Sequence, residues 1–127
     1  MLIVLLISIT IILAVFFVRL PALYVEDEFF YDYYAKSSEK NDCKYKFFIK
    51  WVDNGYRCYI ERTPSFRGRD TTNYMPHYWE ENSTRRHYIC WTGKLQYSEQ
   101  AKTLCRNWAD ATQQFIDTGK PAKGFER

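Results

Sequence analysis

Residues 44–62, KYKFFIKWVDNGYRCYIER, give the strongest local indication of the fold in this chain of 127 residues. Asn54-Gly55 separates two runs of aromatic and β-branched residues, a pattern typical of a β-hairpin with a two-residue turn. A turn at these two residues pairs Trp51 with Cys58. One face of the hairpin then carries the apolar side chains of Tyr45, Phe47, Ile49, Trp51, Cys58 and Ile60. This alternation predicts antiparallel strands with one buried face.

A third strand and a helix are predicted after the hairpin. Residues 86–92, RHYICWT, form a short aromatic run. Ser98 is a favourable helix N-cap, Gly119 is the residue expected after the last helical turn, and Gln113 falls on the polar face. The apolar face contains Ala101, Leu104, Cys105, Trp108, Ala109, Thr112, Phe115 and Ile116. We therefore predict an α+β domain at residues 43–127, a small three-stranded antiparallel sheet packed by a C-terminal helix.

The N-terminal segment is apolar enough to cross a membrane. Leu2 to Val18 contains 17 residues and no charged side chain. As a helix it would be about 26 Å long, close to the hydrocarbon thickness of about 30 Å. Arg19 can reach the headgroups, and the sequence up to Leu23 lacks the small-residue cleavage site of a signal peptide. We predict a retained transmembrane anchor at residues 1–21, with a cleaved signal peptide as the alternative.

Residues 22–42 are predicted to form a stalk helix followed by a linker. Val25, Phe29 and Tyr33 recur every four residues, which places them on one face of a helix. This aromatic stripe would pack either on the domain or on neighbouring anchored chains. The second possibility makes the three residues candidates for partner binding.

Residues 63–85 follow neither the helical nor the strand period, and long loops of this kind are usually functional. The alternative is a loop folded over the edge of the sheet. Aromatic and arginine side chains dominate the energetics of protein interfaces. The candidates for partner contacts in this loop are Phe66, Arg67, Arg69, Tyr78 and Trp79. Asn82 begins an Asn-Ser-Thr sequon, which makes it a candidate glycosylation site of an external domain.

The four cysteines are Cys43, Cys58, Cys90 and Cys105. In a small anchored domain they fit two disulfide bonds in an oxidising compartment, with three connectivities open, or reduced and buried thiols. Contact of Cys105 with Cys58 or with Cys90 is geometrically reasonable. The spacing fits no zinc site and the sequence contains no phosphate-binding loop, so we expect no metal, no cofactor and no small-molecule substrate.

Charge argues against a nucleic-acid partner, because the formal net charge is only +3 and the basic residues form no cluster. No arrangement of residues meets the needs of a catalytic site. The sequence therefore indicates a non-catalytic protein that acts by binding other chains beside a lipid bilayer.

The order of an N-terminal apolar run, then Arg19, then a small domain rich in Tyr, Phe and Cys resembles the per os infectivity factors, envelope proteins of the occlusion-derived virion of baculoviruses. This resemblance implies a single-pass protein with its domain outside the virion envelope, sorted through the host nuclear membrane. It also implies assembly with other membrane-anchored subunits into a complex needed for oral infection.

A second resemblance covers residues 44–119. The order of a hairpin, a loop with Pro64 and His77, a strand with Cys90 and a helix is similar to that of ubiquitin-conjugating enzymes and their bacterial relatives. It implies an enzyme with Cys90 as the thioester nucleophile. The chain lacks the His-Pro-Asn tripeptide of that family, and its strand count is one short. This enzyme is the alternative function.

Overall fold

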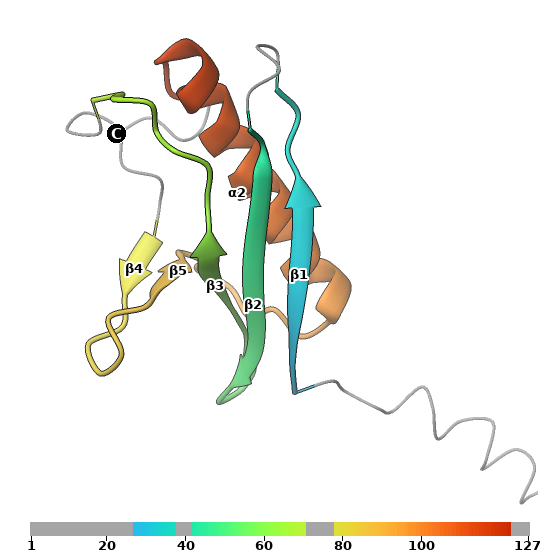
Figure 1. Ribbon diagram of the computed structural model, residues 1–127. Helices are drawn as coiled ribbons and strands as arrows, with labels where there is room; N and C mark the ends of the chain where they lie inside the picture. Colours follow the sequence, from blue (N-terminus) through green and yellow to red (C-terminus); the bar gives the residue numbers. More distant parts are fainter. Residues whose placement is uncertain (1–26, 38–41, 71–77, 123–127) are drawn as a thin grey trace, which may run out of the picture.

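The computed structural model describes residues 27–37, 42–70 and 78–122. They form five antiparallel strands and one helix (Figure 1). The elements are β1 (Glu28–Tyr34), β2 (Lys44–Val52), β3 (Gly55–Arg62), β4 (Tyr78–Glu80), β5 (His87–Ile89) and α2 (Ser98–Thr118). The strand order β1-β2-β3-β5-β4 makes β1 and β4 the two edges of a single sheet.

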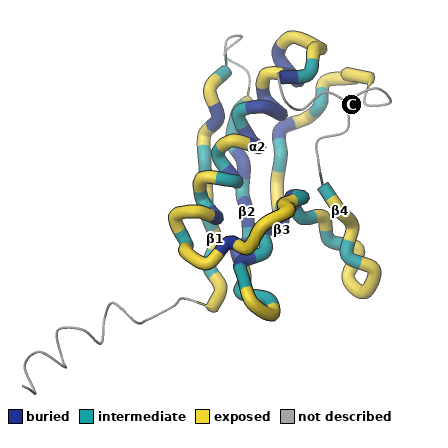
Figure 2. Tube along the Cα trace, turned by 180° about the vertical axis from the view of Figure 1, so that it is seen from behind, coloured by how far each residue is buried: buried dark blue, intermediate teal, exposed yellow. Residues whose placement is uncertain are grey.

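Helix α2 lies across one face of the sheet (Figure 1), and the core is formed between them. Alternate residues of β2 are fully buried, as expected for a strand with one covered face. Figure 2 shows the buried residues concentrated in α2 and the central strands, with exposed residues in the turns. Large side chains of the core include Tyr45, Phe47, Ile49, Tyr56 and Trp108.

The predicted stalk helix and the three-stranded sheet are both wrong. Residues 28–34, within the segment predicted as a stalk, form β1, which pairs with β2 from Glu28↔Lys50 to Tyr34↔Lys44. The aromatic residues of this segment also fit a period of two, and aromatic side chains favour strands. The fifth strand, β4, comes from the segment predicted as an irregular loop. Both additions extend the sheet to five strands.

The hairpin is confirmed, but its turn is shifted. Trp51 pairs with Tyr56 and Val52 with Gly55, so the two-residue turn is Asp53-Asn54 rather than Asn54-Gly55. Asp53 takes the positive φ of 57° that the turn requires. A Cβ atom on Gly55 would lie 3.3 Å from the carbonyl oxygen of Leu95, so this glycine permits close approach of a neighbouring segment. Because the register moves by two residues, each side chain keeps its predicted face.

The helix is confirmed with small corrections. Its N-cap is Tyr97 rather than Ser98, and the side chain of Gln100 accepts a hydrogen bond from the Tyr97 amide over 3.2 Å. Gly119 ends the helix with a φ of 74°, as predicted. Gln113 is fully buried, in contrast to its predicted place on the polar face. Its amide oxygen accepts a hydrogen bond from the Tyr45 hydroxyl, which provides the polar partner that burial demands.

The predicted anchor at residues 1–21 lies outside the described residues. Among the residues that the structure describes, no helix is long and apolar enough to cross a membrane.

Candidate functional site

The predicted aromatic stripe does not form an exposed surface. Phe29 and Tyr33 lie on the side of β1 that faces α2, and both are partly buried against the core. The Tyr33 hydroxyl donates to the Asp110 carboxylate over 2.9 Å, and burial followed by this hydrogen bond raises the pKa of Tyr33. Val25 lies outside the described residues. The exposed aromatic residues of β1 are Phe30 and Tyr34, whose side chains lie on the opposite side of the strand and are 62% and 65% exposed.

The backbone of β1 is open along the edge of the sheet. The Trp51 amide donates to the Asp27 carbonyl over 2.6 Å, and the Ala35 amide to the Cys43 carbonyl over 2.9 Å. Because bonded pairs alternate along an antiparallel ladder, the odd-numbered residues between these two bonds also face β2. The N–H and C=O groups of the even-numbered residues therefore point away from the sheet. These residues are Glu28, Phe30, Asp32 and Tyr34.

The face of the sheet opposite α2 carries a row of aromatic residues from four of its strands. The pairings place Phe30, Phe48, Tyr59 and Tyr88 in one line across β1, β2, β3 and β5. Cations lie over several of these rings. The Arg86 guanidinium is 4.5 Å from the centre of the Tyr59 ring, and Lys46 is 4.6 Å from that of Phe30. This outer face therefore combines aromatic rings and positive charge, a composition that favours protein contacts.

The arginines predicted as partner contacts differ in their surroundings. Arg69 donates from Nε to the Ile116 carbonyl and from Nη2 to the Asp117 carbonyl, both over 2.9 Å. It therefore caps the C-terminal end of α2, while the residue as a whole stays exposed. Arg67 is exposed in the turn before it, with a φ of 55°, and Phe66 is partly buried.

The other candidates of the loop come together near β4. The Tyr78 ring lies tilted by 31° against His87 with ring centres 4.5 Å apart, whereas Trp79 is 61% exposed at the edge of the sheet. Asn82 lies exposed in the turn between β4 and β5. The neighbouring Thr84 hydroxyl is bonded to Glu81, not to Asn82. An exposed turn leaves room for a glycan at this asparagine.

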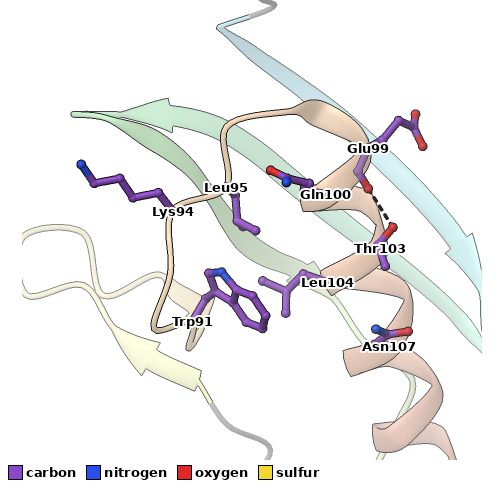
Figure 3. Close-up of a pocket in the computed structure, with 8 residues that line it drawn as sticks. All are labelled: Trp91, Lys94, Leu95, Glu99, Gln100, Thr103, Leu104 and Asn107. Atoms are coloured by element: carbon purple, nitrogen blue, oxygen red, sulfur yellow. Dashed lines mark hydrogen bonds between the residues drawn. The ribbon is translucent and has the colours of Figure 1, made fainter.

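A groove lined by tryptophans lies between the β4 and β5 edge and α2. One hollow of about 480 Å³ is lined by Trp79, Ile89, Cys90, Trp91, Thr92, Leu104, Asn107 and Trp108. A second, of about 390 Å³, adjoins it at Trp91, Leu104 and Asn107 and extends toward Lys94 and Glu99 (Figure 3). Trp91 is 56% exposed. Together the two hollows are as large as a site for a small ligand or a peptide.

The sequence did not identify this groove. Trp91 lies in the predicted third strand, but β5 ends at Ile89 and leaves Trp91 in the following loop. Leu104 and Trp108 were assigned to the helix core. Trp108 is buried there, while Leu104 is only partly buried and points toward Trp91 (Figure 3). Trp91 itself was the available signal, since a strand that ends at Ile89 leaves this large aromatic residue outside the sheet.

All four cysteines are free thiols in the structure, and their pairing stays a prediction. Cys58 and Cys105 are both buried in the core, on β3 and α2. Burial and then a hydrogen bond with Cys58 raise the pKa of the Cys105 thiol. The predicted contact between these two residues is therefore present in the fold.

Cys90, the candidate nucleophile of the alternative function, is partly buried in the loop after β5. Burial raises the pKa of its thiol, and a hydrogen bond from Trp79 only partly opposes this effect. His77, its predicted partner, lies outside the described residues. Among the described residues, no three His, Cys, Asp or Glu side chains gather into a possible metal site.

No protein-family model, curated protein or solved structure matches this chain. A proposal of function therefore has to be argued from the sequence pattern and the surfaces described above.

Proposed function

We propose that this protein is a non-catalytic, membrane-anchored subunit of a viral envelope entry complex. In this proposal residues 1–21 hold the chain in the envelope, and the domain that follows binds other anchored subunits. The viral assignment rests on the resemblance to per os infectivity factors. The binding role rests on the surfaces of the domain.

The observation that carries the binding role is the open edge at β1. This strand has seven residues, contains no proline, and pairs with β2 without a bulge. Natural proteins usually protect such an edge against added strands. The outward backbone groups of Phe30 and Asp32 have no hydrogen-bond partner among the described residues. An extended segment of a partner could form main-chain hydrogen bonds here, with its side chains beside Phe30 and Tyr34.

The position of β1 favours partners in the same membrane. The strand begins only ten residues after Val18, the last residue of the apolar run. Neighbouring anchored chains would therefore meet this edge before any other part of the domain. This placement replaces the helical stripe as the expected contact region beside the membrane.

A proline at Asp32 tests the proposal. It removes one outward N–H without removing a hydrogen bond to β2, so the domain should remain folded. We expect the full-length variant to lose its partners when virion membranes are extracted in mild detergent. Virions that carry this variant should also show lower oral infectivity.

Two controls make this experiment specific. Asp32→Ala keeps the outward N–H and should retain the partners, whereas Tyr31→Pro removes a bond to β2 and should unfold the sheet. Co-purification of Asp32→Pro with an unchanged set of subunits would overturn the proposal that β1 is the interface.

A further inference from the structure

Two of the four cysteines meet in the core, between the sheet and the helix. Cys58 on β3 is 1% exposed and Cys105 on α2 is 0% exposed. The Cys58 Sγ lies 3.6 Å from the carbonyl oxygen of Ala101, the residue one helical turn before Cys105. Because helical side chains point back toward the N-terminus, the Cys105 side chain leans over this same turn. A hydrogen bond between the two thiols agrees with this placement.

Cys43 lies too far from this pair to bond with either member. Ile49 pairs with Cys58 across β2 and β3. The Cys43 carbonyl extends the ladder beyond the start of β2 by accepting from the Ala35 amide. At about 3.4 Å per residue, Cys43 is roughly 20 Å along the strand from the level of Cys58. A disulfide requires Cα atoms within about 7 Å of each other, so the fold excludes a bond from Cys43 to Cys58 or Cys105.

Cys90 is directed away from the buried pair. It follows β5, which pairs with β3 at Tyr59↔Tyr88 and runs toward the turn between β2 and β3. Cys43 lies near the opposite end of the sheet, so Cys43 and Cys90 cannot bond to each other within one chain. The Cys90 thiol accepts a hydrogen bond from Trp79 of β4. Its side chain therefore interacts with the edge of the sheet and not with the buried thiols.

We propose that Cys58 and Cys105 form the one disulfide bond of this domain, joining β3 to α2 across the core, and that Cys43 and Cys90 stay as thiols. The bond forms when the two thiols give two electrons and two protons to a small-molecule disulfide such as oxidised glutathione, which is cleaved to two thiols. In the cell such an oxidant is present on the oxidising side of a membrane. There the inference rests on the proposed external position of the domain.

Burial controls when this bond can form and when it can be broken. Exchange requires a thiolate to reach one of the two sulfur atoms. Both sulfur atoms are enclosed between the sheet and α2. Burial also raises the pKa of the Cys105 thiol, which stays protonated in the folded domain. We therefore expect the bond to form during folding, before the core closes, and to resist reductants afterwards.

The pairing can be mapped on the full-length protein, refolded in detergent micelles in a glutathione redox buffer. Free thiols are alkylated with iodoacetamide in urea, and a non-reducing tryptic digest is analysed by mass spectrometry. Trypsin places the four cysteines in four different peptides, because a Lys or Arg lies between each of them and the next. We expect one linked pair, residues 58–62 with residues 103–106. Cys43 and Cys90 should be recovered as alkylated thiols or glutathione adducts.

The same preparation tests the effect of burial and of the bond on stability. Dithiothreitol should cleave the bond at least roughly tenfold more slowly in the folded domain than in urea, because the sulfur atoms are enclosed. The oxidised protein should have a higher urea midpoint than the reduced protein, because the bond restricts the unfolded chain. A Cys58→Ala variant should lose both the linked pair and this difference in midpoint.

Two control variants make the result specific. The double variant Cys43→Ser, Cys90→Ser should form the same bond as the unaltered protein. Asp32→Pro should form it too, and because the buffer supplies the oxidant, the result is independent of the proposed location and of the β1 interface. A linked pair that includes Cys43 or Cys90, or four alkylated thiols after refolding, would overturn the inference. Equal urea midpoints of the oxidised and reduced proteins would also count against a bond that fits the native core.

Discussion

Glu81 holds the small hairpin of β4 and β5 to the rest of the sheet. Its carboxylate accepts from the Tyr59 hydroxyl over 2.5 Å and from Arg57 over 3.0 Å, with a further bond from Thr84. The hydrogen bond from Tyr59, followed by that from Thr84, lowers the pKa of Glu81 below its ordinary value of 4.5. Its ionised form is therefore favoured by folding.

This pKa predicts a dependence of stability on pH. The lowered pKa contributes stability above the unfolded value of 4.5, and that contribution is lost as the pH falls through the folded pKa. Urea unfolding of the domain should therefore show a lower midpoint in this acidic range. Glu81→Gln should be less stable near neutral pH and should show a smaller loss on acidification. An identical pH profile for the two proteins would contradict this account.

At single positions the helical spacing predicted the burial of large apolar residues correctly. Trp108 and Cys105 are buried as the helical spacing indicates. Gln113 was placed on the surface because it is polar, but the Tyr45 hydroxyl satisfies it inside the core. Arg69 was assigned to an interface because exposed arginines often bind partners. Its contact with the end of α2, 47 residues away, is a tertiary feature that no local pattern reveals.

At the scale of elements, the C-terminal end of α2 depends on the segment after β3. Arg69 brings two donors to carbonyls of the last helical turn, where the helix itself supplies no amide partner. A Cβ atom at the cap residue Gly119 would lie 3.0 Å from Arg69 Nη1, so the guanidinium fits closely against the cap. The helix dipole also favours a cation at this end.

Arg69→Ala should therefore lower the free energy of unfolding by about 1–2 kcal/mol, the usual range for hydrogen bonds to a charged group. Arg85→Ala is the matched control, because Arg85 forms only an exposed ion pair with Glu80 and should change stability by less than about 0.5 kcal/mol. Urea denaturation of both variants measures the difference. Equal stability of the two variants would show that the hydrogen bonds from Arg69 contribute nothing to the stability of the fold.

The elements that the sequence predicted well are those with long, regular patterns. The hairpin and α2 have such patterns, and both are present. The pattern of residues 28–34 fits a helix and a strand alike, and only pairing with β2 decides between them. Strand β4 has three residues, too few for any period to be recognised, whereas β5 lies within residues 86–92, which were predicted as the third strand. The Asn54-Gly55 pair led to a wrong predicted register, because Gly55 is needed for the close contact with Leu95 and not for the turn.

At the scale of the whole molecule, the proposal of an external domain makes a topological prediction. We expect the anchor to be retained and the domain to lie outside the envelope. Protease added to intact virions should therefore remove the domain, and the released fragment should lack residues 1–21. Detergent-permeabilised virions serve as the control for cleavage. Complete protection of the domain in intact virions, with cleavage only after detergent, would reverse the orientation.

The place of β1 at the edge also determines how the domain responds to mechanical tension. Any pull transmitted from the chain before Asp27 enters the fold at this strand and loads first the bond between the Asp27 carbonyl and the Trp51 amide. The remaining bonds to β2 follow along the ladder, together with the side-chain bonds that Tyr31 and Tyr33 form with α2. A second strand hydrogen-bonded to the outer side of β1 would share that load. Assembly through this edge would therefore make the domain harder to pull apart by force.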